Sequence, residues 1–278
     1  MAEMANEGED LHQQGEEALN NGDYAKAITL FEQAAERKSS RAELALGKVF
    51  YLGPGVPQDF ERAFSHFQRA KETVDNQADK AEALYYLAQM LRSGFGVELN
   101  LPTALDFLLQ SADLGNCKAL RLLGRIYSEG LGVAVDGRKA LAFYERAAEN
   151  DYRAKMALGE IYSKGIGVPV DGNKAVAWYE KAAETTERKD DNPAWNVIFR
   201  INAMDALSKM YRNGIGIPKD EEKATFWWEK SKSLWIMCMK EKYGGDFDAE
   251  NWPTLSSWSD MLRDYLPRNL FKTGSEVK

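Results

Sequence analysis

Apolar and small residues recur along most of the chain in one pattern, which is repeated five times. A stripe of apolar residues at helical spacing comes first, a loop with two glycines follows, and a second apolar stripe with an alanine and an aromatic pair completes the unit. Positions 1, 5, 8 and 9 of the first stripe, counted from its leading alanine, are apolar in nearly every copy, and the 100° step of an α-helix places them on one face. Each unit is therefore predicted to be a pair of antiparallel helices.

Each position of the pattern has a physical reason. The glycines permit the positive φ angles that a sharp reversal requires, and the Asp or Asn that follows is a natural N-cap for the second helix. The alanine four residues later lets that helix approach its neighbour, and a pair such as Trp178–Tyr179 fills the space between the helices. The glycines are Gly53 and Gly55, Gly94 and Gly96, Gly130 and Gly132, Gly165 and Gly167, and Gly214 and Gly216; the caps and alanines are Asp59 and Ala63, Asn100 and Ala104, Asp136 and Ala140, Asp171 and Ala175, and Asp220 and Ala224.

This pattern resembles the Sel-1-like repeat family, a relative of the tetratricopeptide repeat. The resemblance covers residues 41–232, and the third and fourth copies match nearly every signature position. Leu99–Pro102 replaces the usual loop in the second copy, and Ser208 replaces a glycine in the fifth. The resemblance implies an all-α fold, a right-handed superhelical solenoid of antiparallel helix pairs, with about 12–14 helices and no sheet.

The ends and one insertion depart from the repeat. Trp195 and Phe199, in the insertion 185–201, lie four residues apart and share a helix face, so they either pack inward on a lengthened helix pair or protrude toward a partner. Leu255–Tyr265 has the spacing of a final helix across the last repeat. The predicted organisation is a tetratricopeptide-like cap at 1–40, five repeats at about 41–80, 81–115, 116–151, 152–201 and 202–232, and capping helices with a frayed tail at 233–278.

Composition narrows the class of partner. A net charge of −7 disfavours binding to nucleic acid or an anionic membrane, and no apolar run is long enough to span a bilayer.

The acidic N-terminal segment has no signal-peptide core, so a cytoplasmic location is expected. Two cysteines, Cys117 and Cys238, are too few for a disulfide framework and are expected to be reduced, buried thiols.

Candidate chemistry is sparse. His12 and His66 have no partner motif and are interpreted as surface or half-buried spacers, so neither catalytic residues nor a metal site are expected. The glycine loops recur in every repeat, which favours structural turns over phosphate binding, and no cofactor is predicted. Some relatives are associated with β-lactamase activity, and such enzymes carry an S-x-x-K motif. In this chain that pattern occurs only at 275–278, in the predicted frayed tail. The protein is therefore expected not to be an enzyme, and a hydrolase is a remote alternative.

Two functions remain. The resemblance implies a scaffold or adaptor that binds a protein or peptide in a concave groove, and the alternative is a dedicated inhibitor such as a bacterial immunity protein that neutralises a toxin. An adaptor makes exchangeable contacts, whereas an inhibitor forms one very tight complex.

The resemblance also locates the groove, at positions 3, 7 and 10 of each first helix. These positions lie about 180° from the apolar face and begin with Leu44 in the first repeat. Basic residues outnumber acidic ones there, so the partner is expected to be acidic, although exposed helix positions are commonly polar in any case. The predicted groove residues are Lys48, Tyr51, Tyr85, Gln89, Arg92, Arg121, Arg125, Met156, Lys209 and Arg212.

Overall fold

The fold is all-α, as predicted. The structure, a computed structural model, describes residues 2–72, 76–185 and 193–243, and this part of the chain contains twelve helices and no strand. The helices are α1 (Ala2–Asn20), α2 (Tyr24–Glu36), α3 (Ser40–Leu52), α4 (Phe60–Glu72), α5 (Gln77–Ser93), α6 (Leu101–Asp113), α7 (Cys117–Glu129), α8 (Gly137–Ala148), α9 (Tyr152–Lys164), α10 (Gly172–Ala183), α11 (Pro193–Asn213) and α12 (Glu221–Tyr243).

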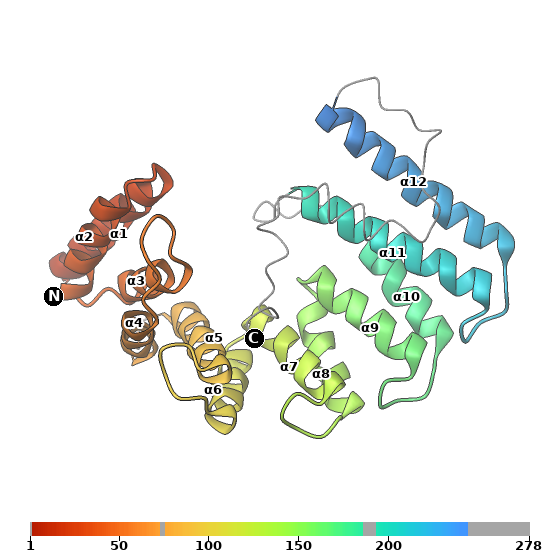
Figure 1. Ribbon diagram of the computed structural model, residues 1–278, viewed down its shortest axis with the longest axis horizontal. Coiled ribbons are helices and arrows are strands. Elements are labelled where there is room, and N and C mark those ends of the chain that lie inside the picture. The colour runs from red at the N-terminus through yellow and green to blue at the C-terminus, as the bar shows by residue number, and fades with distance from the viewer. Residues whose placement is uncertain (1, 73–75, 186–192, 244–278) are drawn as a thin grey trace.

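Six antiparallel helix pairs follow one another to form a solenoid. Figure 1 shows them along an open arc, with α3 and α5 on its inner side and α4 and α6 on its outer side. The first helices of successive repeats also touch one another, α3 with α5, α7 with α9 and α9 with α11. First helices therefore line the inner face, as the repeat architecture requires.

The predicted turns and caps are confirmed. Gly165 and Gly167 have φ angles of +69° and +64°, and the other loop glycines take the same left-handed conformation. The Asp171 carboxylate accepts a hydrogen bond from the backbone nitrogen of Lys174 at 3.0 Å, which satisfies one of the free donors at the start of α10. The same cap occurs at Asp59, Asn100, Asp136 and Asp220.

Within each helix pair, a small residue of the first helix lies against a large side chain of the second. A Cβ added to Gly159 would lie 2.5 Å from the ring of Tyr179, so only glycine fits there. Tyr179 is buried, whereas its neighbour Trp178 is half-buried, so in this repeat the second member of the aromatic pair fills the hairpin core. Equivalent contacts join Gly15 to Phe31, Gly47 to Phe67 and Gly124 to Tyr144.

Successive repeats meet where a loop glycine lies against the start of the preceding pair's second helix. A Cβ added to Gly167 would lie 2.6 Å from the backbone nitrogen of Gly137, so the two backbones are in contact. Backbone contacts of this kind also join Gly216 to Gly172 and Gly96 to Phe60. Gly132 differs, because the only described atom near such a Cβ, apart from its chain neighbours, is Leu101 Cδ1 at 3.2 Å.

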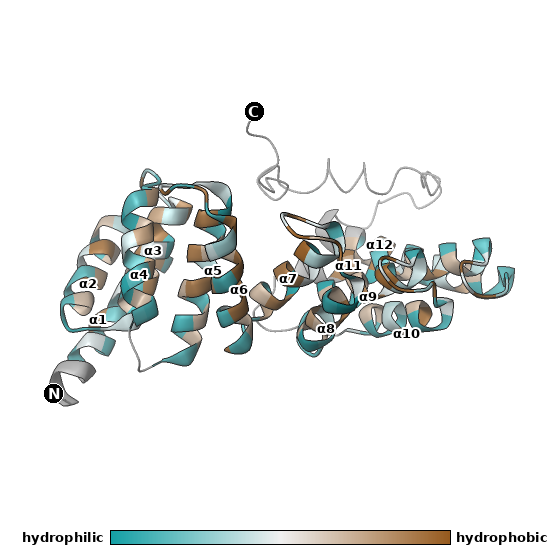
Figure 2. Ribbon diagram, turned by 90° about the horizontal axis from the view of Figure 1, so that it is seen from below, coloured by the Kyte–Doolittle hydropathy of each residue, from teal (hydrophilic) through white to brown (hydrophobic). Residues whose placement is uncertain are grey.

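Apolar side chains also appear on the surface of the loops. Figure 2 shows apolar residues both between the paired helices and in the loops that join them. Leu99, Leu101 and Leu131 are 56%, 39% and 41% exposed. One edge of the solenoid therefore presents apolar side chains to solvent between the second and third repeats counted from residue 41.

The insertion lengthens the first helix of the last pair. α11 begins at Pro193, and the ring of Phe199 packs on Tyr152 with their centroids 4.0 Å apart. For Phe199 the inward-packing interpretation is therefore confirmed, and the side chain of Trp195 lies outside the described residues. The last pair continues along α12 to Tyr243, with Trp235 buried, whereas the predicted helix at Leu255–Tyr265 and the tail lie outside the described residues.

Candidate partner-binding groove

Five of the predicted groove residues lie together on the inner face formed by α3, α5 and α7. Gln89 connects two of them, because its Nε2 donates to the Tyr85 hydroxyl at 3.2 Å and its Oε1 accepts from Arg92 Nε and Nη2 at 3.3 and 3.1 Å. Tyr51, Tyr85 and Arg125 all lie close enough to Arg92 to shift its pKa. We call Tyr51, Tyr85, Gln89, Arg92 and Arg125 the groove cluster.

The positive charges of the two arginines in the groove cluster act on each other. Burial lowers the pKa of Arg92 below its ordinary value, and the neighbouring positive charge of Arg125 lowers it further. Within the part of the chain that the structure describes, neither Arg92 nor Arg125 forms an ion pair with a carboxylate. Their charges are therefore available to an anionic group brought by a partner.

Burial also shapes the aromatic part of the groove cluster. The pKa of Tyr51 is raised, because burial and the neighbouring Tyr85 both disfavour the phenolate. The ring of Tyr51 packs edge-on against Tyr86, with centroids 5.4 Å apart. These rings form an apolar wall beside the two arginines.

The other four basic groove residues have carboxylate partners within the chain. Arg121 Nε donates to Asp151 Oδ2 at 2.9 Å, and Lys48 Nζ donates to Glu82 Oε2 at 2.7 Å. Lys209 lies 2.6 Å from Asp205, and Arg212 lies 3.9 Å from Glu221. The positive charge predicted for the whole groove is thus partly neutralised. Among the described residues, the basic groove residues without a carboxylate partner are Arg92 and Arg125 of the groove cluster.

Position 3 does not face away from the core in every repeat. Leu44 is only 5% exposed, so that prediction is wrong for the first repeat. Met156 is partly buried against the core that contains Tyr179 and Met204. The reason is that a first helix such as α3 contacts helices on three sides, namely α2, α4 and α5. Only a narrow strip around positions 7 and 10 is left for a partner in that repeat.

His66 is buried and paired with a carboxylate, so its interpretation as a surface or half-buried spacer is wrong. Its Nδ1 lies 2.7 Å from Glu43 Oε2, and Arg69 Nε lies 2.9 Å from Glu43 Oε1. The His66 ring stacks on Phe50 at 5.7 Å. Because Glu43 and His66 come from different helices, no sequence motif identified this cluster in advance, and its position inside one hairpin indicates a structural role.

Other chemistry-bearing residues are dispersed. In residues 2–72, 76–185 and 193–243, no group of three or more His, Cys, Asp or Glu side chains is placed to hold a metal ion. Cys117 and Cys238 are half-buried rather than buried. No helix in this part of the chain has the length and apolar character needed to cross a membrane.

Fold and groove together define an α-solenoid of short helix pairs with a charged and aromatic inner face. The chain belongs to the Sel1 repeat family, whose repeats are typical of protein–protein interaction. The family model, described as Sel1 repeat, also matches the N-terminal unit that the sequence predicted to be tetratricopeptide-like. Its matches cover residues 1–39, 40–72, 81–116, 117–152, 153–184 and 201–234.

The chain is also similar to two curated proteins and to one solved structure of a Sel1 repeat protein. The alginate biosynthesis protein AlgK of Azotobacter vinelandii is 36% identical over 102 residues, which cover 37% of this chain and 21% of the relative. AlgK of Pseudomonas syringae pv. tomato is 32% identical over 122 residues, covering 44% and 25%. The chain thus spans at most about a quarter of the length of these curated relatives. A crystal structure of a Sel1 repeat protein from Oxalobacter formigenes is similar at 27% identity with a TM-score of 0.65, covering 91% of this chain and 98% of that one.

Proposed function

We propose that the chain is a scaffold that holds an acidic segment of a protein partner against the groove cluster and catalyses no reaction itself. The observation that carries the proposal is the pair Arg92 and Arg125, which lie on the first helices of successive repeats and have no ion-pair partner among the described residues. A planar guanidinium can hold a carboxylate through two parallel hydrogen bonds. A carboxylate placed between two arginines would also relieve their mutual repulsion.

Tyr51 and Tyr85 support the same proposal. Aromatic residues and arginine are enriched at the centres of protein interfaces, where they supply most of the binding energy. Lys48 and Arg121 are involved in intramolecular ion pairs, so we assign them a smaller part in partner binding.

The test begins with a pull-down from the native host and mass spectrometry to identify the partner. Isothermal titration then compares the wild-type chain with the Arg92→Glu/Arg125→Glu variant at two salt concentrations. If the pairs between these arginines and the partner's carboxylates are buried, the binding free energy is expected to weaken by about 2–5 kcal/mol. If the pairs lie at the rim of the interface, the main effect is a slower association rate. Higher salt should weaken wild-type binding more than binding by the variant.

A matched control reverses two exposed charges elsewhere, Arg138→Glu on α8 and Lys219→Glu in the α11–α12 loop. It changes the net charge equally and should leave affinity within about twofold of wild type. Equal affinity for the groove variant and wild type, with the helical circular dichroism intact, would contradict the proposal. A single partner held with picomolar affinity would instead indicate the inhibitor alternative.

A further inference from the structure

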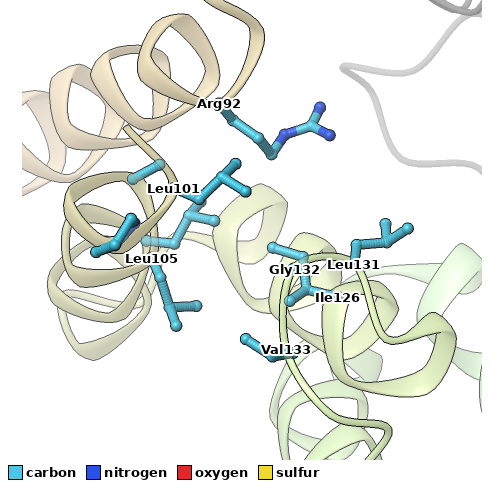
Figure 3. Close-up of a pocket in the computed structure, with 10 residues that line it drawn as sticks. Arg92, Leu101, Leu105, Ile126, Leu131, Gly132 and Val133 are labelled. Carbon is cyan, nitrogen blue, oxygen red and sulfur yellow. The ribbon is translucent and has the colours of Figure 1, made fainter. Parts of the chain in front are cut away.

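A pocket of about 230 Å³ opens between the start of α6 and the α7–α8 loop. Leu101 and Leu105 line it on the α6 side, and Leu131 and Val133 line it on the side of the next repeat. Figure 3 shows these side chains on two sides of a gap, with Arg92 above it. The pocket lies beside the groove cluster, because Arg92 belongs to both.

The pocket forms at a junction where the loop glycine does not pack on the backbone of the preceding pair. At the next two junctions the capping Asp is followed by Gly137 or Gly172, and the incoming loop glycine packs directly on that backbone. Here Leu101 and Pro102 occupy the corresponding positions, and Gly132 has only the tip of Leu101 near it. The α7–α8 loop therefore lies farther from α6 at this junction, and the space between them is the pocket.

The lining determines what the pocket can accept. Its side chains are apolar except for Arg92. Sites for drug-sized ligands usually exceed about 300 Å³, so this pocket suits a single side chain. Leu101 and Leu131 at its rim are 39% and 41% exposed, so an apolar occupant would cover surface that now contacts water.

We propose that this pocket takes one leucine-sized or phenylalanine-sized side chain from an internal segment of the partner, with the carboxylate of an adjacent Asp or Glu against Arg92 and Arg125. The inference rests on the proposed function and adds the chemistry of the bound segment. Charge complementarity selects this occupant, because Arg92 places a positive charge at the mouth of an otherwise apolar cavity. An uncharged apolar segment would bring no carboxylate to that guanidinium, whose hydrogen bonds within the described residues go to the neutral amide of Gln89.

Short acetylated and amidated peptides of Ser, Gly and Glu test the pocket by fluorescence anisotropy. The first probe has a central Leu-Glu pair, the second has Ser in place of that Leu, and the third has Gln in place of that Glu. Burial of a leucine side chain contributes about 1.5–3 kcal/mol, so the first probe should bind at least about tenfold more tightly than the second. The third should also bind more weakly than the first, because it lacks the adjacent carboxylate.

Two leucine-to-tryptophan variants locate the effect. Leu105→Trp fills the pocket, whereas Leu99→Trp adds the same bulk at an exposed loop position outside it. The advantage of the Leu probe over the Ser probe should disappear in Leu105→Trp and persist in Leu99→Trp. Circular dichroism checks the fold of both variants, and the comparison of probes on the wild-type chain does not depend on either.

The outcomes separate the pocket from the groove. Equal binding of the Leu and Ser probes, both lost in Arg125→Glu, would overturn the pocket and leave the proposed function standing. Binding that is indifferent to Arg125→Glu, or no binding of any acidic probe, would overturn both. Binding of the Leu probe only after its C-terminal amide is replaced by a free carboxylate would show that the occupant is a chain end and would overturn the internal segment proposed here.

Discussion

Arg121 on α7 is joined to Asp151 at the start of α9 through a hydrogen bond of 2.9 Å from Nε to Oδ2. The other carboxylate oxygen of Asp151 accepts from the backbone nitrogen of Arg153 at 2.8 Å. One carboxylate thus caps a helix and connects two successive repeats. Arg121, predicted from its position to bind a partner, already has a role in stacking.

Removing that charge should therefore lower stability. Arg121→Gln is expected to lower the free energy of unfolding by about 0.5–1 kcal/mol, the scale of a partly exposed ion pair. Arg121→Glu should cost more, because it places a second negative charge beside Asp151. Urea denaturation gives the values, and Arg125→Gln serves as the control because no ion pair of Arg125 exists among the described residues. Equal midpoints for Arg121→Gln and Arg125→Gln would show that the bond between the repeats contributes nothing.

The contact between Gly159 and Tyr179 makes a second prediction. Gly159→Ala would place a methyl group 2.5 Å from the tyrosine ring and should cost about 1–3 kcal/mol, as overpacking of a core does. The corresponding positions of α5 and α6 hold Ala88 and Leu108, both fully buried. In that repeat a larger residue on the first helix thus faces a smaller side chain on the second, so the same fold accepts alanine where the residue opposite is not a tyrosine.

A double-mutant cycle on unfolding free energies tests this compensation. Gly159→Ala combined with Tyr179→Leu should be less destabilising than the sum of the two single variants, by about 0.5–3 kcal/mol. Strict additivity would show that the ring does not set the size of the residue opposite it.

A third prediction separates two costs of replacing a loop glycine. Gly115 has a φ of +85° and nothing within 4 Å of an added Cβ, so Gly115→Ala measures the left-handed backbone alone, about 1–2 kcal/mol. Gly132→Ala should cost slightly more. Gly167→Ala should cost clearly more than either, because the new methyl meets the Gly137 backbone at 2.6 Å. Similar urea midpoints for all three variants would mean that the loop does not pack on the preceding repeat.

The sequence predicted features that are local to one helix end or one loop. The caps at Asp136 and Asp171 and the positive φ angles of Gly165 and Gly167 follow from the chemistry of single residues, and all are confirmed. Burial of the alanine in each second helix, such as Ala140, is confirmed for the same reason.

Contacts between helices were harder to predict. The pair formed by Arg121 and Asp151 depends on how two repeats are rotated against each other, which the pattern of one repeat does not specify. Burial of Leu44 likewise depends on the number of helices around α3. The pocket beside Leu101 depends on how far the α7–α8 loop lies from α6, and the sequence of one repeat does not specify that distance.

The cluster of Glu43, His66 and Arg69 should make stability depend on pH. Burial acts to raise the pKa of Glu43, but hydrogen bonds from His66 and Arg69 outweigh it and hold the pKa below the ordinary value of 4.5. The folded state therefore favours the ionised carboxylate more than the unfolded state does. This contribution is fully present above pH 4.5 and is lost as the pH falls through the lowered folded-state pKa.

Glu43→Gln tests this dependence. It should be less stable than wild type at pH 7 by about 1–3 kcal/mol, the cost of removing the charged hydrogen-bond partner of the buried His66. The difference should shrink when both proteins are unfolded in urea well below pH 4, because protonation removes the same charge from wild type. Glu61→Gln, at an exposed position on α4, is the control and should leave stability within about 0.5 kcal/mol of wild type at both pH values. A Glu43→Gln deficit that stays constant between the two pH values would mean that the carboxylate acts through its shape rather than its charge.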